Sequence, residues 1–140
     1  MVTTAGKCHC GELRWEVTTA EAPVHILCHC SACKLIGGSD YTLNLVVPKD
    51  NCKITSETQP SVYTYKGDSG NDVQCFYCPK CTSHPWHYQT VNADNYVVRT
   101  ALLEGAENFP VAAEVYNKEK WAFQPQIAAP ESVFATVPPS

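Results

Sequence analysis

The sequence predicts a mainly β protein with little helix, and three features indicate this class. Apolar runs of strand length are separated by turns rich in Pro and Gly, of which the chain has 10 and 7. No window of about 12 residues or more repeats its apolar side chains with a helical period. The nine cysteines fall mostly into three tight clusters, an arrangement typical of sheets joined by metal ions. Residues 1–140 are expected to form a single domain.

The expected strands follow in chain order. Leu, Trp and Val alternate with charged side chains over residues 13–17, which is the period of a half-buried strand. The run at residues 41–47 is β-branched and aromatic and is stopped by Pro48. The run at residues 62–65 ends at a Lys-Gly-Asp turn. These two runs and two more strands are expected at residues 41–47, 62–65, 73–77 and 96–100.

The last third of the chain predicts smaller elements. Residues 115–116 and 121–123 are expected to form a hairpin across residues 117–120. Helix is limited to a turn or two after Cys33. The segment 125–140 is rich in Pro and Ala and is expected to wrap the surface or fray.

Charge and apolar content exclude several classes of function. The formal net charge is −4 and the Lys and Arg residues are scattered, so no nucleic-acid partner is expected. The first residues lack the basic and apolar regions of a secretory signal, and no apolar run approaches the length of a membrane span. We therefore expect a cytoplasmic protein without membrane contact. In such a reducing compartment, dense cysteines indicate metal ligands rather than disulfides, and an odd number cannot pair completely.

Two cysteine pairs predict a structural zinc site. Cys78 and Cys81 have the C-x-x-C spacing of a zinc knuckle, and Cys8 with Cys10 supplies a second pair from one strand. Cys75 offers an alternative C-x-x-C with Cys78, but Pro79 favours a turn between residues 78 and 81. Cys75, like Cys52, is expected to be a buried thiol without a metal.

Cys28, Cys30 and Cys33 predict a second zinc site. Three protein ligands are typical of catalytic zinc, whose fourth position binds water or substrate. Three thiolates leave Zn²⁺ with a net charge of about −1, which favours ligation of a soft substrate thiolate over hydrolysis. The alternative is a closed, inert site whose fourth ligand is a histidine. The candidates for that ligand are His29, His84 and His87.

The three clusters, with the glycines beside them, resemble the glutathione-dependent formaldehyde-activating enzyme family, which includes centromere protein V. The matching segments are Gly6–Gly11, Cys28–Lys34 with Gly38-Ser39, and Phe76–Cys81. The resemblance implies a β-tent of stacked antiparallel sheets with two zinc ions. It also implies a carbon–sulfur lyase reaction that joins glutathione and formaldehyde to S-hydroxymethylglutathione. By matching positions, Cys8, Cys10, Cys78 and Cys81 would hold the structural zinc, and Cys28, Cys30 and Cys33 the catalytic zinc.

The chain departs from the family pattern at three places. Thr82 replaces a frequent glycine, and a left-handed conformation is costly for a β-branched residue, so the turn is expected to differ there. Lys34-Leu35 replaces an Arg-Lys pair, which removes one contact for glutathione carboxylates. Residues 83–88 are unusually rich in His and aromatic side chains.

Three residues outside the ligand sets are candidates for catalysis. His84 and His87 could act as general acid or base, and Lys34 could steer an anionic substrate. The expected function is a zinc-dependent lyase acting on a thiol adduct or small carbonyl compound, with glutathione or a thiol conjugate as substrate. One alternative is an enzyme of specialised metabolism that acts on an aromatic metabolite without glutathione. Another is a non-catalytic zinc module that binds a protein partner. The sequence predicts no oligomeric state.

Overall fold

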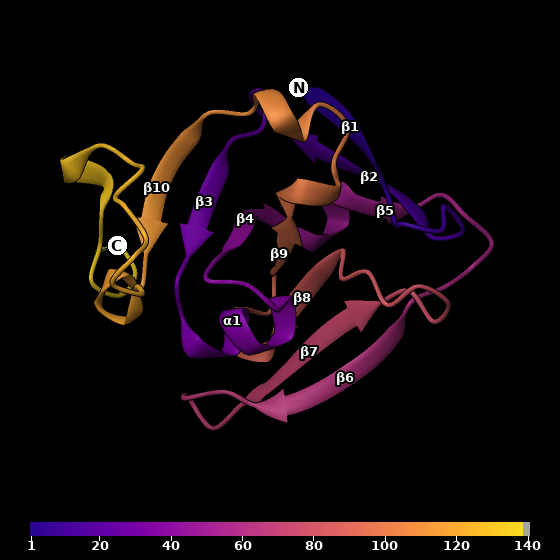
Figure 1. Cartoon of the computed structure of the whole chain (residues 1–140). Coiled ribbons are helices and arrows are strands. Elements are labelled where there is room, and N and C mark those ends of the chain that lie inside the picture. Colours follow the sequence, from indigo (N-terminus) through magenta and orange to yellow (C-terminus); the bar gives the residue numbers. More distant parts are fainter. Residues whose placement is uncertain (139–140) are drawn as a thin grey trace.

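The computed structural model describes residues 1–138 and consists of two stacked β-sheets with one short α-helix (Figure 1). The smaller sheet has the order β1-β2-β5 and the larger one the order β10-β3-β4-β9-β8-β7-β6. All strand pairs are antiparallel except β10 with β3. The predicted mainly β fold is confirmed, with one parallel pair at the edge of the larger sheet.

The strands predicted at residues 13–17, 41–47, 62–65, 73–77 and 96–100 are all present, with bounds within two residues of the predicted ones. The small sheet comprises β1 (Val2–Lys7), β2 (Arg14–Thr19) and β5 (Cys52–Ile54). The large sheet comprises β3 (His25–Cys28), β4 (Thr42–Pro48), β6 (Ser61–Lys66), β7 (Asp72–Tyr77), β8 (Trp86–Gln89), β9 (Asn95–Arg99) and β10 (Val111–Val115). The α-helix is α1 (Ser31–Gly37). Short 3₁₀ helices span Lys49–Asn51, Thr90–Asn92, Thr100–Leu102, Ala106–Asn108, Asn117–Glu119 and Pro130–Ser132.

The main core lies between the two sheets. Trp15 and Val17 alternate inward along β2, as the sequence predicts, and each is only 1% exposed. The Trp15 ring meets Trp86 of β8 edge to face, with ring centroids 5.8 Å apart. A Cβ on Gly6 of β1 would lie 2.3 Å from the indole of Trp15. The close approach of β1 to this ring therefore requires glycine.

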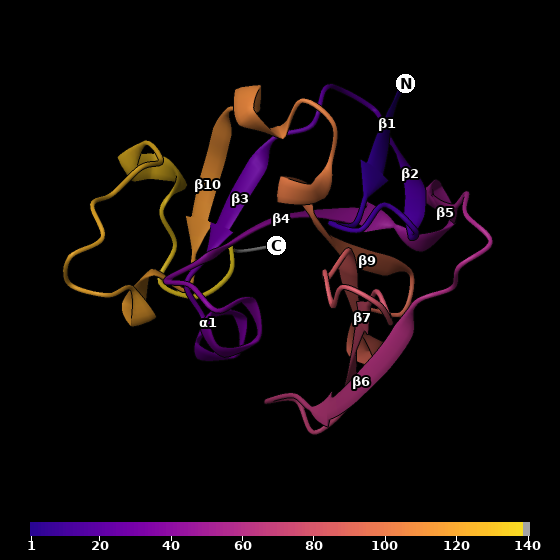
Figure 2. The ribbon, with the colours of Figure 1, turned by 45° about the vertical axis from the view of Figure 1, so that its right-hand side comes forward.

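The large sheet presents a different face away from that core. Val98 and Trp86 pair in register and face the core. Because side chains alternate along a strand, Arg99, Asn44 and His87 face the opposite side. Figure 2 shows β1, β2 and β5 on one side of β4 and β9, and α1 on the other. A Cβ on Gly37 would lie 2.8 Å from Thr42 Cγ2, so α1 packs closely against β4.

The predicted hairpin over residues 115–123 is wrong. Val115 ends β10, which pairs in parallel with β3 instead. Tyr116 then takes a left-handed conformation with φ of 54°, and a 3₁₀ turn follows. Residues 121–123 form no strand. The apolar pattern of residues 111–115 is therefore satisfied by β3, a partner distant in sequence that a local turn signal does not reveal.

The segment after residue 124 wraps against β10, as predicted, and lies beside it in both ribbon views (Figures 1 and 2). Phe134 N donates to Glu114 O at 2.9 Å, and Tyr116 N donates to Thr136 O at 2.8 Å. Residues 139–140, which belong to the same prediction, lie outside the described residues. None of the helices in residues 1–138 has the length and apolar composition that crossing a membrane requires.

Candidate metal centres

Four cysteine sulfurs from two turns meet at one place. Cys8 and Cys10 follow the end of β1, and Cys78 and Cys81 follow the end of β7. The expectation that Cys8 and Cys10 share a strand is wrong, because a turn carries them: Gly11 N donates to Cys8 O at 3.1 Å. The Sγ atom of Cys10 lies 3.5 Å from that of Cys8 and 3.8 Å from that of Cys78. All four sulfurs of the group lie within 4.8 Å of one another.

This donor set fits zinc. A tetrahedral site with Zn–S bonds of about 2.3 Å separates its sulfurs by about 3.8 Å, close to the distances found. Leu13 N donates to Cys8 Sγ at 3.3 Å, which orients that sulfur. The pKa of the Cys81 thiol is lowered to about 5, first by the Ser83 hydroxyl and then by a backbone hydrogen bond at Cys10. A thiolate at neutral pH is the form that binds a metal.

Thr82 adopts the left-handed backbone conformation that we expected a β-branched residue to avoid. Its φ is 67°, so the expectation that this turn would change shape is wrong. The turn is held by Thr82 N donating to Cys78 O and by Cys78 N donating to Ser83 O, each at 2.9 Å. The Thr82 hydroxyl also donates to Cys81 O at 2.6 Å. These bonds hold a β-branched residue in a conformation that favours glycine.

Three further sulfurs meet between β3 and α1. Cys28 ends β3, Cys30 caps α1, and Cys33 lies in its first turn. Cys33 N donates to Cys30 Sγ at 3.3 Å, and this bond caps the first turn of the helix. The helix therefore begins at Ser31, before Cys33 and not after it as predicted. The sulfurs of Cys28 and Cys33 lie 3.4 Å apart, and all three lie within 4.8 Å of one another. Three converging sulfurs fit a soft divalent metal, and we call them the three-cysteine group.

A buried polar chain leads from Arg99 to the three-cysteine group. Arg99 Nη1 donates to Asn44 Oδ1 at 2.9 Å, and Asn44 Nδ2 donates to Thr42 Oγ1 at 2.9 Å. The pKa of Cys33 is lowered, first by hydrogen bonds from Cys28 and Cys30, and further by Thr42 and the charge of Arg99. Sequence reasoning missed these three polar residues. Their signal was a pair of polar side chains at alternate positions of β4 and a charged residue at the end of the apolar run in β9.

His29 points away from the sulfurs on either side of it. Its Nε2 lies 2.8 Å from Glu114 Oε1, and both side chains are fully buried. Glu114 Oε2 accepts from Ile127 N at 2.7 Å and from Ala128 N at 2.9 Å. The carboxylate thus joins the loop between two cysteines to the C-terminal segment. In the described part of the chain, no histidine belongs to either cysteine group.

His84 and His87 lie near the same polar face as Arg99. Desolvation, and next the charge of Arg99, lower the pKa of both, that of His87 to about 4. Both rings are therefore neutral at pH 7. Gln89 Nε2 lies 3.2 Å from His87 Nε2. The Nδ1 atom of His84 is buried and has no hydrogen-bond partner among the described residues.

Lys34 turns toward the segment that follows β10. Its Nζ donates to Glu119 O and lies 5.1 Å from the centre of the Trp121 ring. Cys52 and Cys75 belong to neither cysteine group. Burial raises the pKa of Cys75 and raises that of Cys52 to about 12, so both are thiols at neutral pH. That they carry no metal stays a prediction.

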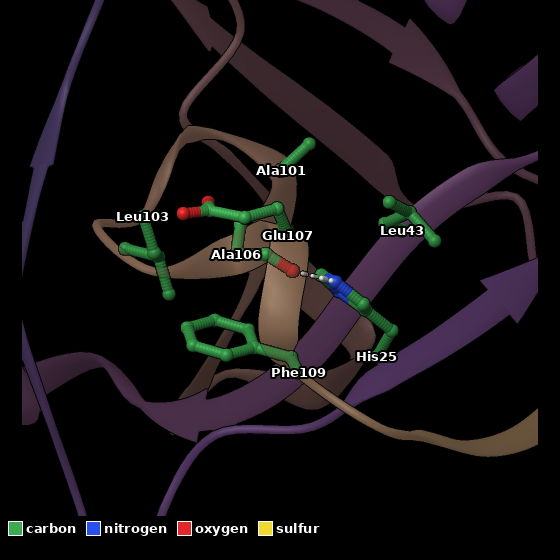
Figure 3. A pocket seen from close by; sticks show the side chains of 7 residues that line it. All are labelled: His25, Leu43, Ala101, Leu103, Ala106, Glu107 and Phe109. Atoms are coloured by element: carbon green, nitrogen blue, oxygen red, sulfur yellow. Dashed lines mark hydrogen bonds between the residues drawn. The ribbon is translucent and has the colours of Figure 1, made fainter.

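Two surface cavities lie away from the three-cysteine group. One of about 420 Å³ is lined by His25, Leu43, Ala101, Leu103, Ala106, Glu107 and Phe109 (Figure 3). His25 Nε2 lies 2.8 Å from Ala106 O and its Nδ1 lies 2.6 Å from Thr100 Oγ1, so both ring nitrogens are engaged. The other cavity, of about 690 Å³, adjoins Cys8 and His9. Neither is lined by a residue of the three-cysteine group.

Comparisons with known proteins agree with the arrangement of the cysteines. The family model described as glutathione-dependent formaldehyde-activating enzyme matches residues 3–119. A protein of Halomonas elongata, provisionally named a glutathione-dependent formaldehyde-activating enzyme, is 30% identical over 83 residues, which is 58% of this chain and 53% of that protein. The chain thus spans about half the length of this curated relative.

A solved structure has a similar fold. The crystal structure of a Rhodobacter sphaeroides protein superposes with a TM-score of 0.55 at 23% identity, covering 72% of this chain and 88% of that one. At this level of identity the likeness establishes the fold.

Proposed function

Because this chain belongs to the glutathione-dependent formaldehyde-activating enzyme family, we propose that it is a zinc-dependent enzyme of the carbon–sulfur lyase class. Its substrates are a small carbonyl compound and a thiol, either glutathione or a thiol conjugate. The observation that carries the proposal is the three-cysteine group, in which no histidine of the described residues takes part. A set of three protein ligands is typical of catalytic zinc, whereas a closed site has four.

The donor set decides what the metal contributes. With three thiolates, bound Zn²⁺ would have a net charge of about −1 and would supply a position for a soft substrate sulfur or a carbonyl oxygen. The guanidinium of Arg99, linked to this group through Asn44 and Thr42, adds one positive charge on its side of the sheet. The chain thereby offsets the excess negative charge of its own ligands.

The proposed reaction is the reversible addition of a thiol to a carbonyl carbon. The sulfur–carbon bond forms as the carbonyl π bond breaks, and the thiol proton passes to the carbonyl oxygen. A neutral imidazole can take a proton and return it, and both His84 and His87 are neutral at pH 7. We assign the proton transfer to this pair. Lys34, on α1 beside Trp121, is proposed to attract an anionic substrate.

The four-cysteine group has a different proposed role. Cys8 and Cys78 are 1% and 0% exposed and belong to the core cluster that contains Trp15. A zinc ion held there would join the turn after β1 to the turn after β7, two segments about seventy residues apart. A metal that binds only the folded chain adds its binding energy to the stability of the fold. We therefore propose a structural zinc at this site.

Metal analysis combined with an activity assay tests the proposal. We expect two zinc ions per chain and, by NMR with ¹³C-formaldehyde, faster formation of the glutathione adduct than without enzyme. Cys30→Ser should lose one zinc ion and the activity. Cys52→Ser, which changes a cysteine outside both groups, should keep two ions and full activity.

Three results would contradict the proposal: fewer than two zinc ions in the wild type, an active Cys30→Ser variant, or no rate enhancement with any thiol and aldehyde. The last result with two ions bound would favour the non-catalytic zinc module. Turnover of an aromatic metabolite without a thiol would instead favour the enzyme of specialised metabolism. That alternative was suggested by the aromatic side chains of residues 83–88; one of them, Trp86, is only 3% exposed and stacks on Tyr96.

A further inference from the structure

Arg99 is a buried cation without a carboxylate partner in the described part of the chain. Its side chain lies on β9 opposite Asn44 and is only 8% exposed. The three ion pairs of residues 1–138 are formed by His29, Lys66 and Lys80 with acidic residues, and Arg99 is in none of them. A buried charge is normally paired, because its desolvation is otherwise uncompensated. The position of Arg99 therefore calls for an anion.

Most of the hydrogen-bonding capacity of this guanidinium is unused. It has five N–H donors, and its only hydrogen bond to the described residues runs from Nη1 to Asn44 Oδ1 at 2.9 Å. None of its nitrogens is among the fully buried polar atoms that lack a partner. The unused donors therefore keep contact with solvent, and a ligand could reach them.

The titratable groups whose pKa values respond to the charge of Arg99 include no carboxylate. Its charge contributes to the pKa values of Cys33, Cys75, His84, His87 and Tyr65. Among these, the two imidazoles are neutral at pH 7, and burial raises the pKa of Tyr65 to about 12 and that of Cys75 as well. Among residues 1–138, therefore, no carboxylate forms an ion pair with this buried guanidinium.

Without Arg99, the net negative charge at the three-cysteine group would repel a substrate that has a second anionic group besides its thiolate. Three thiolates and Zn²⁺ together have a net charge of about −1, which the guanidinium cancels. A substrate thiolate adds another negative charge, and a second anionic group on the same molecule would be repelled without the arginine. Lys34 is proposed to attract an anionic substrate by its charge, but its ammonium group already donates to Glu119 O, so it does not supply a paired contact for this second anionic group.

We propose that Arg99 binds a carboxylate of the substrate beside the three-cysteine group. The proposal rests on the proposed function in one respect, since it takes that group as the place where the substrate sulfur binds. A guanidinium can hold a carboxylate through two parallel N–H bonds, and this fixes the orientation of the substrate. The carboxylate belongs either to the thiol, as in glutathione, or to the carbonyl compound, as in a 2-oxo acid.

Two small thiols of similar size test the proposal without requiring turnover. Mercaptoacetate has a carboxylate and 2-mercaptoethanol has a neutral hydroxyl in its place. We measure the affinity of each for the zinc-loaded protein by calorimetry, and we compare the ratio of the two affinities among variants. The wild type should prefer mercaptoacetate by about tenfold to a hundredfold, the range of a charge-assisted hydrogen bond. Arg99→Met should reduce this ratio to near one.

Two variants control for loss of structure and of charge. Arg99→Lys keeps a buried cation but not the planar pair of donors, so its ratio should fall between those of the wild type and Arg99→Met. Lys53→Met removes an exposed charge on β5 and should keep the wild-type ratio. Because the ratio compares two ligands on one protein, partial unfolding of a variant cancels from it.

Kinetics then assign the source of the carboxylate. A raised KM for glutathione with formaldehyde in Arg99→Lys places the carboxylate on the thiol. A raised KM for glyoxylate with 2-mercaptoethanol places it on the carbonyl compound. The proposal is overturned if Arg99→Met keeps the wild-type ratio, or if it loses zinc and weakens both thiols equally. A wild-type preference that disappears in Arg99→Met, in a protein without lyase activity, would support the proposal and reject the proposed function.

Discussion

Glu114 offers the most direct test of how the protein holds the loop that contains Cys28 and Cys30. The side chain is fully buried, and its two oxygens accept from the C-terminal segment and contact His29. Glu114→Ala removes three hydrogen bonds at once. It leaves a buried imidazole and the N–H groups of Ile127 and Ala128 without their acceptor.

The size of the effect follows from these contacts. Each hydrogen bond to a buried charged group contributes about 1.5–3 kcal/mol, and removing one partner of a buried pair costs about 3–5 kcal/mol. The C-terminal segment can move into water and recover two of its bonds. We therefore expect the free energy of unfolding to fall by about 3 kcal/mol. Glu114→Gln keeps one acceptor oxygen, so the loss should be about 1–2 kcal/mol.

Urea unfolding followed by tryptophan fluorescence measures this loss, with zinc content recorded for each variant. A loss of 3 kcal/mol lowers the midpoint by about 1–3 M urea, given slopes of about 1–3 kcal/mol per M. Glu57→Ala removes an exposed carboxylate and serves as the control. If Glu114→Ala unfolds within about 0.5 kcal/mol of Glu57→Ala, the carboxylate does not support the loop and the reasoning fails.

The same contacts predict a pH dependence. Burial by itself raises the pKa of Glu114, but hydrogen bonds from Ala128, Ile127 and His29 outweigh it, and the pKa is lowered from its ordinary value of 4.5. A lowered pKa in the folded state stabilises the fold fully above the unfolded value, and this contribution is lost as the pH falls through the folded value. The difference between wild type and Glu114→Ala should thus be constant above about pH 5 and shrink in more acidic solution.

Three further predictions concern single positions. Gly6→Ala should lower the free energy of unfolding by about 1–3 kcal/mol, because the new methyl group would overlap the Trp15 indole; an unchanged urea midpoint would contradict this. Thr82→Gly should raise the melting temperature of the zinc-loaded protein, because it removes the backbone strain of a left-handed β-branched residue, which is about 1 kcal/mol or more. A lower melting temperature would show that the hydrogen bond of the Thr82 hydroxyl contributes more than the strain costs. If His87 is the proton acceptor, the acidic limb of the profile of kcat/KM against pH should lie near its pKa of about 4 rather than near 6.5, and His87→Gln should remove that limb.

The sequence predicts the local features of the fold well because alternation reports burial directly. Trp15 and Val17 face the core as their spacing indicates, and the four cysteines of the first group meet although a turn rather than a strand carries two of them. The hairpin at residues 115–123 was predicted wrongly because the true partner of β10 is β3, which lies far away in the sequence. Local propensity contains no information on such pairing.

The surroundings of the three-cysteine group were harder to predict. Spacing alone indicates that Cys28, Cys30 and Cys33 can converge, but not that Arg99 and Asn44 share their side of the sheet. That placement depends on strand order and register, which join β4 to β9 across about fifty residues. The conformation of Thr82 was also not predictable from local preference, because neighbouring hydrogen bonds hold it in a left-handed conformation that β-branched residues disfavour.

The alternation along β9 has a consequence for how this protein can diverge. Val98 packs in the core, while Arg99, the next residue, lies on the opposite face of the sheet with Asn44. If Arg99 binds the substrate as proposed, residues for stability and residues for recognition alternate along one strand. Substitutions at the odd positions could retune what the protein recognises while the even positions continue to hold the sheets together. Inserting or deleting a single residue there would exchange the two sets and damage both at once.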